Sequence, residues 1–170
     1  MSTNHRLIAG LFFGLVCLLV AAPSAAGVDW PKDGWRVIET SQSYSELLAN
    51  LKKAVSANDL NVVFDVGPTE AAAKRGIHIP GNRVVGVFNN KFAVDILRLS
   101  VPAMIEAPIR FYVTERDDGH ATLSWVEPSH IFAPYIEDVG SSDDAKMLRQ
   151  EAEELDARFS RIASEAAQGK

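Results

Sequence analysis

The stretch IRFYVTERDDGHATLSWV, residues 109–126, decides the fold class of this chain. Residues 109–115 alternate between aliphatic or aromatic side chains on one side and polar side chains or tyrosine on the other, and residues 121–126 alternate again. The sequence between them, Asp117-Asp118-Gly119, is a hairpin turn signal. An apolar residue at every second position is typical of a strand with one face against a core. The stretch therefore predicts two antiparallel strands that share one buried face.

Strands and helices are also predicted upstream of this hairpin. The expected strands are 35–40, 60–66 and 83–88, and the expected helices are 43–57, 69–75 and 91–100. Ser43 and Glu46 have the spacing of a capping box at the start of the first helix. Residues 83–88 are almost continuously apolar, which favours a central strand. A loop is expected at 78–82, and a connector between Pro102 and Pro108.

A long helix is predicted at 141–167, with Ser141 at its start. Its apolar residues recur at steps of three and four: Leu148, Ala152, Leu155, Phe159, Ile162 and Ala166. Such a stripe fits either a coiled-coil seam or a helix laid on a sheet. About three heptads is the lower limit for a coiled coil, so we favour the helix laid on the domain.

These elements predict an α+β fold. We expect a single, mainly antiparallel sheet with helices packed largely on one face, plus the long C-terminal helix. The domain is expected to span 35–136, after a polar lead-in at 27–34. No internal repeat or low-complexity segment interrupts it.

The first 26 residues have the three parts of a secretory signal peptide. Arg6 precedes an uncharged, mostly apolar run of 16 residues, 7–22, and small residues follow. The run is shorter than the roughly 20 residues of a spanning helix. We expect cleavage after Ala26, with cleavage after Ser24 as the alternative. A lipid anchor at Cys17 is disfavoured, because five more apolar residues follow it.

The composition of the chain indicates its cellular compartment and limits the classes of partner that it could bind. Cleavage after Ala26 leaves 144 residues with 16 basic and 22 acidic side chains, a net charge of −6 with neutral histidine. That balance does not favour nucleic acid or anionic lipid as a partner. Cys17 is the only cysteine, so the mature chain would have no disulfide, cysteine nucleophile or cysteine metal ligand. These features indicate secretion across the inner membrane to the periplasm, with no membrane attachment after cleavage.

No catalytic signature emerges from the mature chain. His78, His120 and His130 lack the local spacing of metal ligands. Neither a Gly-x-Ser-x-Gly turn nor a glycine-rich phosphate loop is present. The acids at strand ends, such as Glu115 and Glu127, are typical of solvated positions. We therefore expect no catalytic residues, metal or cofactor; the tryptophans are interpreted as core or edge packing, with an aromatic ligand platform as the alternative.

One set of residues favours an anion. Asn89 and Asn90 open a helix directly after a buried strand, where free backbone N–H groups suit a negative charge. Lys91 adds a positive charge, and Arg110 with Tyr112 follows on a neighbouring strand. These five residues are the predicted ligand-binding set, for a small anion. The alternative is that Asn89 caps the helix and that Lys91 and Arg110 are surface charges.

Residues 40–128 resemble the domain of unknown function 302 (DUF302) family, of which this chain would be an exported member. The ordered landmarks are Phe64, the run 70–76, Phe88-Asn89-Asn90-Lys91, Ala107-Pro108-Ile109-Arg110, Asp118-Gly119, and Trp125-Val126-Glu127-Pro128. Family members often have Asp-His where Gly67-Pro68 stands, and Asn-Pro-Lys where residues 89–91 stand, so no role of that Asp-His pair transfers. The resemblance implies an arrangement like that of the TATA-binding protein, and it implies no activity.

Three functions follow as hypotheses. The first is non-enzymatic binding of a small anionic ligand or a partner protein. The second is an enzyme whose site is assembled from scattered polar residues on the sheet. The third is a structural homodimer, paired through a sheet edge or the long helix; the chain is otherwise expected to be a monomer.

Overall fold

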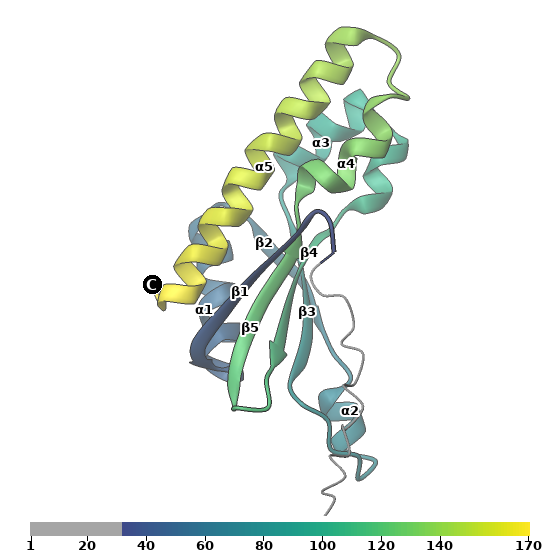
Figure 1. The fold of residues 1–170 in the computed structure, drawn as a ribbon. Coiled ribbons are helices and arrows are strands. Elements are labelled where there is room, and N and C mark those ends of the chain that lie inside the picture. The colour runs from purple at the N-terminus through teal and green to yellow at the C-terminus, as the bar shows by residue number, and fades with distance from the viewer. Residues whose placement is uncertain (1–31) are drawn as a thin grey trace, which may run out of the picture. The chain divides into compact units, whose positions relative to one another are not determined.

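The structure is a computed structural model that describes residues 32–170. The predicted signal peptide at 1–26, and the lead-in up to residue 31, lie outside the described residues. The elements follow in the order β1 (Trp35–Ser43), α1 (Tyr44–Ala57), β2 (Asn61–Val66), α2 (Thr69–Ala73), β3 (Asn82–Phe88), α3 (Asn90–Leu99), the 3-10 helix η1 (Pro102–Glu106), β4 (Ile109–Glu115), β5 (His120–Val126), α4 (Pro128–Ile136) and α5 (Ser142–Gln168) (Figure 1). None of the helices from residue 32 onward is long and apolar enough to span a membrane.

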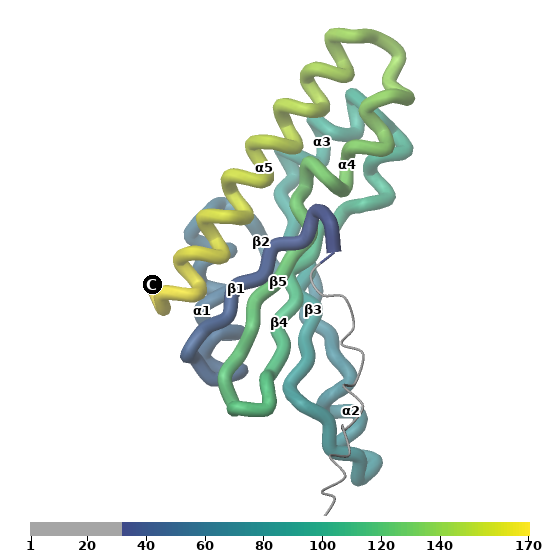
Figure 2. The backbone as a smooth tube through the Cα atoms, in the orientation of Figure 1, coloured from purple at the N-terminus to yellow at the C-terminus, as the bar shows by residue number. Residues whose placement is uncertain are grey.

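The five strands form one antiparallel sheet in the order β1-β5-β4-β3-β2 (Figure 2). The predicted hairpin is its centre: β4 pairs with β5 on one side and with β3 on the other. This confirms the α+β fold, the single antiparallel sheet and the long C-terminal helix.

One face of the sheet, which we name the covered face, carries the core. The register sets Val85, Phe111 and Trp125 side by side on it, and all three are buried. Helix α5 lies against this side, where the Phe159 ring stacks on Phe111 with centroids 4.5 Å apart. We name the opposite side, which receives the alternate side chains of the same strands, the open face.

Helix α5 presents the predicted stripe to the rest of the domain. Leu148, Phe159 and Ile162 have no exposed surface. The helix contacts α1, α3, α4 and β1, so the stripe packs within the chain rather than in a coiled-coil seam. Gln42, at the end of β1, donates from its Nε2 to the carbonyls of Ala166 and Ala167 near the last turn. These bonds satisfy carbonyl groups that a helix end otherwise leaves open.

Helix starts follow the predicted chemistry. The Ser43 hydroxyl accepts the Glu46 N–H at 3.4 Å, and the Glu46 carboxylate accepts the Ser43 N–H at 2.9 Å, which completes the capping box. The Ser43 hydroxyl and the Ser43 N–H both donate to the Glu46 carboxylate and hold the pKa of Glu46 below its usual value. Ser141 caps α5 by accepting the Asp144 N–H at 3.1 Å.

The structure adds two helical segments that the sequence did not predict. Helix α4 follows directly after β5, with Pro128 in its first turn, where a missing N–H costs nothing. The Asp156 carboxylate of α5 accepts the Ser129 N–H at 2.9 Å and so supplies a cap from a distant helix. The connector between Pro102 and Pro108 contains η1. Together with α3, α4 lies beside the first half of α5, whereas α2 lies at the other end of the sheet (Figure 1).

Element ends differ by a few residues from those predicted. Strand β1 runs to Ser43 rather than to residue 40, with an irregular register between Glu39 and Ser43. Helix α2 ends at Ala73, because the chain turns through residues 74–76 and Gly76 has a φ of 73°. Asn82 belongs to β3 rather than to the preceding loop.

Candidate open-face ligand site

The open face of the sheet has a depression of about 430 Å³. Strand β4 forms the middle of the depression, because its side chains alternate between the two faces of the sheet. Ile109 and Phe111 point into the core, so Arg110 and Tyr112 point the other way. The register places Val84 opposite Tyr112 and Trp35 opposite Val126. The lining residues come from four strands and α4, and they include Trp125 although its ring centroid lies 5.9 Å from that of Phe111 on the covered face: Trp35, Asn82, Val84, Arg110, Tyr112, Trp125, Val126 and Ile131.

A polar pair fixes one side of this depression. Asn82 Nδ2 donates to the Tyr112 hydroxyl at 2.5 Å. Because both side chains are partly buried, this bond orients the phenol ring and the carboxamide together. The depression therefore has a fixed polar wall beside the apolar side chains of Val84 and Val126.

A glycine on the neighbouring strand determines what packs beside Arg110. Gly86 lies opposite Arg110 on β3, and the Phe64 ring of β2 covers it. A Cβ atom added at Gly86 would lie 2.2 Å from a carbon of the Phe64 ring, so only glycine fits beneath the ring. This packing places the Phe64 ring over the residue that lies opposite Arg110.

Arg110 is the charged group of the depression. Its side chain is exposed, and within residues 32–170 it forms no hydrogen bond or ion pair. A guanidinium with open donors binds carboxylate or phosphate in a planar, two-point geometry. The depression can therefore hold an anionic group at Arg110 and an apolar body against Val84, Val126 and Trp35.

The start of α3 is occupied by its own cap. Asn89 Oδ1 accepts the N–H groups of Lys91 and Phe92 at 2.8 and 3.2 Å, and its Nδ2 donates to the Asp59 carbonyl at 2.6 Å. Lys91 Nζ pairs with Asp95 at 3.2 Å, and that hydrogen bond raises the pKa of Lys91. Asn90 is the first residue of the helix.

The structure thus divides the five predicted anion-binding residues into two groups. Arg110 and Tyr112 line the open-face depression, and Asn89, Asn90 and Lys91 do not. The N-terminus of α3 lies toward the covered side, because Phe92 and Ile96 pack into the core. Asn89 instead borders a small cavity between the sheet, α3 and α5.

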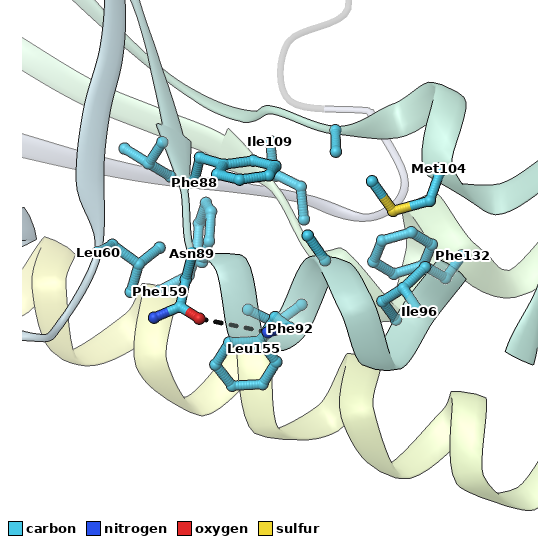
Figure 3. A pocket seen from close by; sticks show the side chains of 13 residues that line it. Leu60, Phe88, Asn89, Phe92, Ile96, Met104, Ile109, Phe132, Leu155 and Phe159 are labelled. Atoms are coloured by element: carbon cyan, nitrogen blue, oxygen red, sulfur yellow. Dashed lines mark hydrogen bonds between the residues drawn. The ribbon is translucent and has the colours of Figure 1, made fainter. Parts of the chain in front are cut away.

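That small cavity is a gap in the core packing (Figure 3). It has a volume of about 40 Å³, and its walls include Phe92, Leu155 and Phe159. Organic ligands occupy pockets of about 300–1,000 Å³. The open-face depression falls in this range, and the cavity beside Asn89 does not.

The carboxylates whose pKa values depart from their usual values lie apart from one another in the fold. Hydrogen bonds from Arg116 and His120 hold the pKa of Asp118 far below its usual value at the β4–β5 turn. Burial raises the pKa of Glu151 on α5. Glu46 is part of the cap of α1. Within residues 32–170, no three His, Cys, Asp or Glu side chains gather in a group that could hold a metal ion.

The sequence alone missed part of the depression. Asn82 was expected in a loop, and Trp35 was interpreted as packing. One signal in the sequence could have found Asn82. Alternate residues of a strand share a face, and Asn82 lies two residues before Val84. Ile131 had no such signal, since it depends on α4.

Comparisons with known proteins agree on one family. The model of the family described as "Domain of unknown function DUF302" matches residues 37–165. A crystal structure of an uncharacterized conserved DUF302 protein from Bacillus stearothermophilus superposes with a TM-score of 0.61 at 14% identity, over 77% of this chain and 99% of that one. At that identity the likeness concerns the fold. No curated protein matches the chain. The chain belongs to the DUF302 family.

Proposed function

We propose that this protein is an exported, non-enzymatic binding domain whose open-face depression takes a small organic anion with a flat apolar body. The observation that carries the proposal is the placement of Arg110. Its guanidinium, which lacks a protein partner within residues 32–170, lines a depression of about 430 Å³ whose other walls are largely apolar or aromatic.

The side chains that line the depression favour one class of ligand over others. Charge-assisted hydrogen bonds to a guanidinium contribute about 1.5–3 kcal/mol. Apolar surface buried against Val84 and Val126 adds about 25 cal/mol per Å². An inorganic anion would gain only the first contribution, and a neutral apolar molecule only the second. A carboxylate on a flat aromatic body gains both.

Binding is favoured over catalysis at the open-face depression because neither a carboxylate nor a histidine is among the described residues that line it. Glu46 belongs to a helix cap, Asp118 to a hairpin turn, and Glu151 to the contact of two helices. General acid–base catalysis requires such groups within hydrogen-bond reach of one substrate. None of these three lines the open-face depression.

Calorimetric titration tests the binding proposal. We would titrate the processed protein, expressed from the full chain, with acetate, benzoate and phosphate. Benzoate should bind more tightly than the other two, and Arg110→Met should weaken it about ten- to hundredfold, in line with the loss of charged hydrogen bonds. Arg161→Met, which removes an exposed arginine from α5, is the matched control and should leave the affinity unchanged. Equal losses in both variants, or no binding of any probe, would reject the proposal.

Native mass spectrometry of protein from its own cell envelope complements the titration. Gentle ionisation should release the protein with an organic acid of low mass bound in part of the population. The Arg110→Met variant, purified in the same way, should arrive without it. Retention of the same ligand by that variant would place the site elsewhere.

The proposal of export rests on residues 1–26 and on the position of Cys17. N-terminal sequencing of the secreted product should begin at Gly27. A product that keeps Met1, or one that carries lipid on Cys17, would contradict it.

A further inference from the structure

A second candidate surface lies around α3, and none of its residues lines the open-face depression. Five large apolar side chains are exposed on α3, on the turn and 3-10 helix η1 that follow it, and on α5, and α3 contacts both of those helices; we name these five residues the α3 strip: Val94, Leu97, Val101, Ile105 and Met147. Ile105 is 79% exposed and Val101 is 71% exposed. Within residues 32–170, the other large exposed apolar side chains are Val63, Val66 and Ile77. A gathered apolar surface of this kind marks an interaction site more often than scattered residues do.

The α3 strip borders a depression of about 340 Å³ between α3 and α5. Three charged side chains line this depression: Asp95 pairs with Lys91 of its own helix at 3.2 Å, whereas Arg98 and Glu151 do not pair with each other. Arg98, on α3, forms no ion pair or hydrogen bond with its side chain within the described part of the chain. Glu151, on α5, is partly exposed, and its side chain forms no hydrogen bond or ion pair within residues 32–170. Partial burial raises the pKa of Glu151, as expected for a carboxylate that lacks sufficient donors.

We propose that the α3 strip is the contact surface of a homodimer, in which Arg98 of each copy pairs with Glu151 of the other. A two-fold interface requires one patch that complements itself. This patch has a positive group, a negative group and an apolar strip beside them, so two copies related by a two-fold axis satisfy both charges at once.

The charge pattern favours a second copy over other occupants. A basic partner would complement Glu151 but would repel Arg98. An acidic partner, or an anionic lipid surface, would do the reverse. A copy of the same chain provides both opposite charges in equal number, together with an apolar surface of equal extent.

Sedimentation velocity and light scattering test the proposal. Because the surface is modest, we expect a dissociation constant on the order of 10–100 µM, so the wild-type mass should rise from monomer to dimer across this range. R98E and E151R should each be monomeric there, and the R98E/E151R double variant should dimerise again. R149E, which reverses an exposed charge on α5 outside the depression, should dimerise like the wild type.

A second variant guards against a folding defect at Glu151, which lies between α3 and α5. L97D introduces a charge on the exposed strip and should also give a monomer, with an unchanged circular dichroism spectrum. A wild type that stays monomeric up to about 1 mM overturns the proposal, whether or not it retains a foreign protein or binds phospholipid vesicles. A dimer that survives R98E and L97D overturns it as well. Ligand titrations of the open face are independent of these results, because no residue of the α3 strip lines that depression.

Discussion

On β4, Phe111 points to one face of the sheet and its neighbours Arg110 and Tyr112 point to the other, and the two faces have different environments. The covered face is closed by helices, and Phe111 has no exposed surface. The open face keeps a depression of about 430 Å³ and an arginine with no described partner. Strand β4 thus provides both stability, through its covered face, and a candidate site, through its open face. Substitutions at odd and even positions of β4 should therefore separate the two properties.

The largest contrast is expected between two phenylalanines. Phe159→Ala removes a ring that stacks on Phe111 and has no exposed surface. It should lower the free energy of unfolding by about 3–5 kcal/mol, measured by urea denaturation. The same change at Phe64, which is partly exposed on the open face, should cost roughly 1–2 kcal/mol. Equal costs at the two positions would show that the open face is as much a part of the core as the covered face.

Gly86 gives an intermediate effect on the open face. A Cβ there would overlap the Phe64 ring at 2.2 Å, so Gly86→Ala must push the ring aside. We expect a loss of about 1–3 kcal/mol. In the Gly86→Ala/Phe64→Ala double variant the two losses should not add, because the clash has gone. Additive losses would mean that the ring does not limit the residue at position 86.

The smallest effect is expected at Trp125, in the covered face. Its indole Nε1 is buried, and no acceptor within residues 32–170 reaches it. Trp125→Phe leaves a small gap but also removes this unsatisfied donor, and the two contributions oppose each other. The free energy of unfolding should change by less than about 1 kcal/mol. A loss of several kcal/mol would indicate that the N–H has a partner in solution.

The strands and helix starts were predictable because their signals are local. Alternation in residues 109–126 identified the central hairpin, and the Ser43 and Ser141 caps have hydrogen bonds of the expected kind. The C-terminal stripe also identified its own buried side, since Leu148, Phe159 and Ile162 recur at helical spacing. In each case residues close together in the sequence determine the type of element and which side of it is buried.

The candidate site was predictable only in part because it depends on which side of the sheet each element lies. The sequence placed Arg110 and Tyr112 on one face, and the structure keeps them together. It did not determine that α3 packs toward the covered side, which separates Asn89 from the depression. Helix α4 was missed because Asp156, a residue of α5, caps its first turn. Such long-range contacts leave no local pattern.

A nuclear magnetic resonance titration of the processed protein with benzoate shows which face of the sheet binds the anion. It compares the two places where the sequence put anion-binding residues. We expect the Arg110 Nε–H and Trp35 indole signals to shift in a saturable way, while the backbone amides of Asn89 and Lys91 stay unchanged. Shifts confined to Asn89–Lys91, or the absence of any saturable shift, would contradict the claim that the open face of the sheet is the binding face.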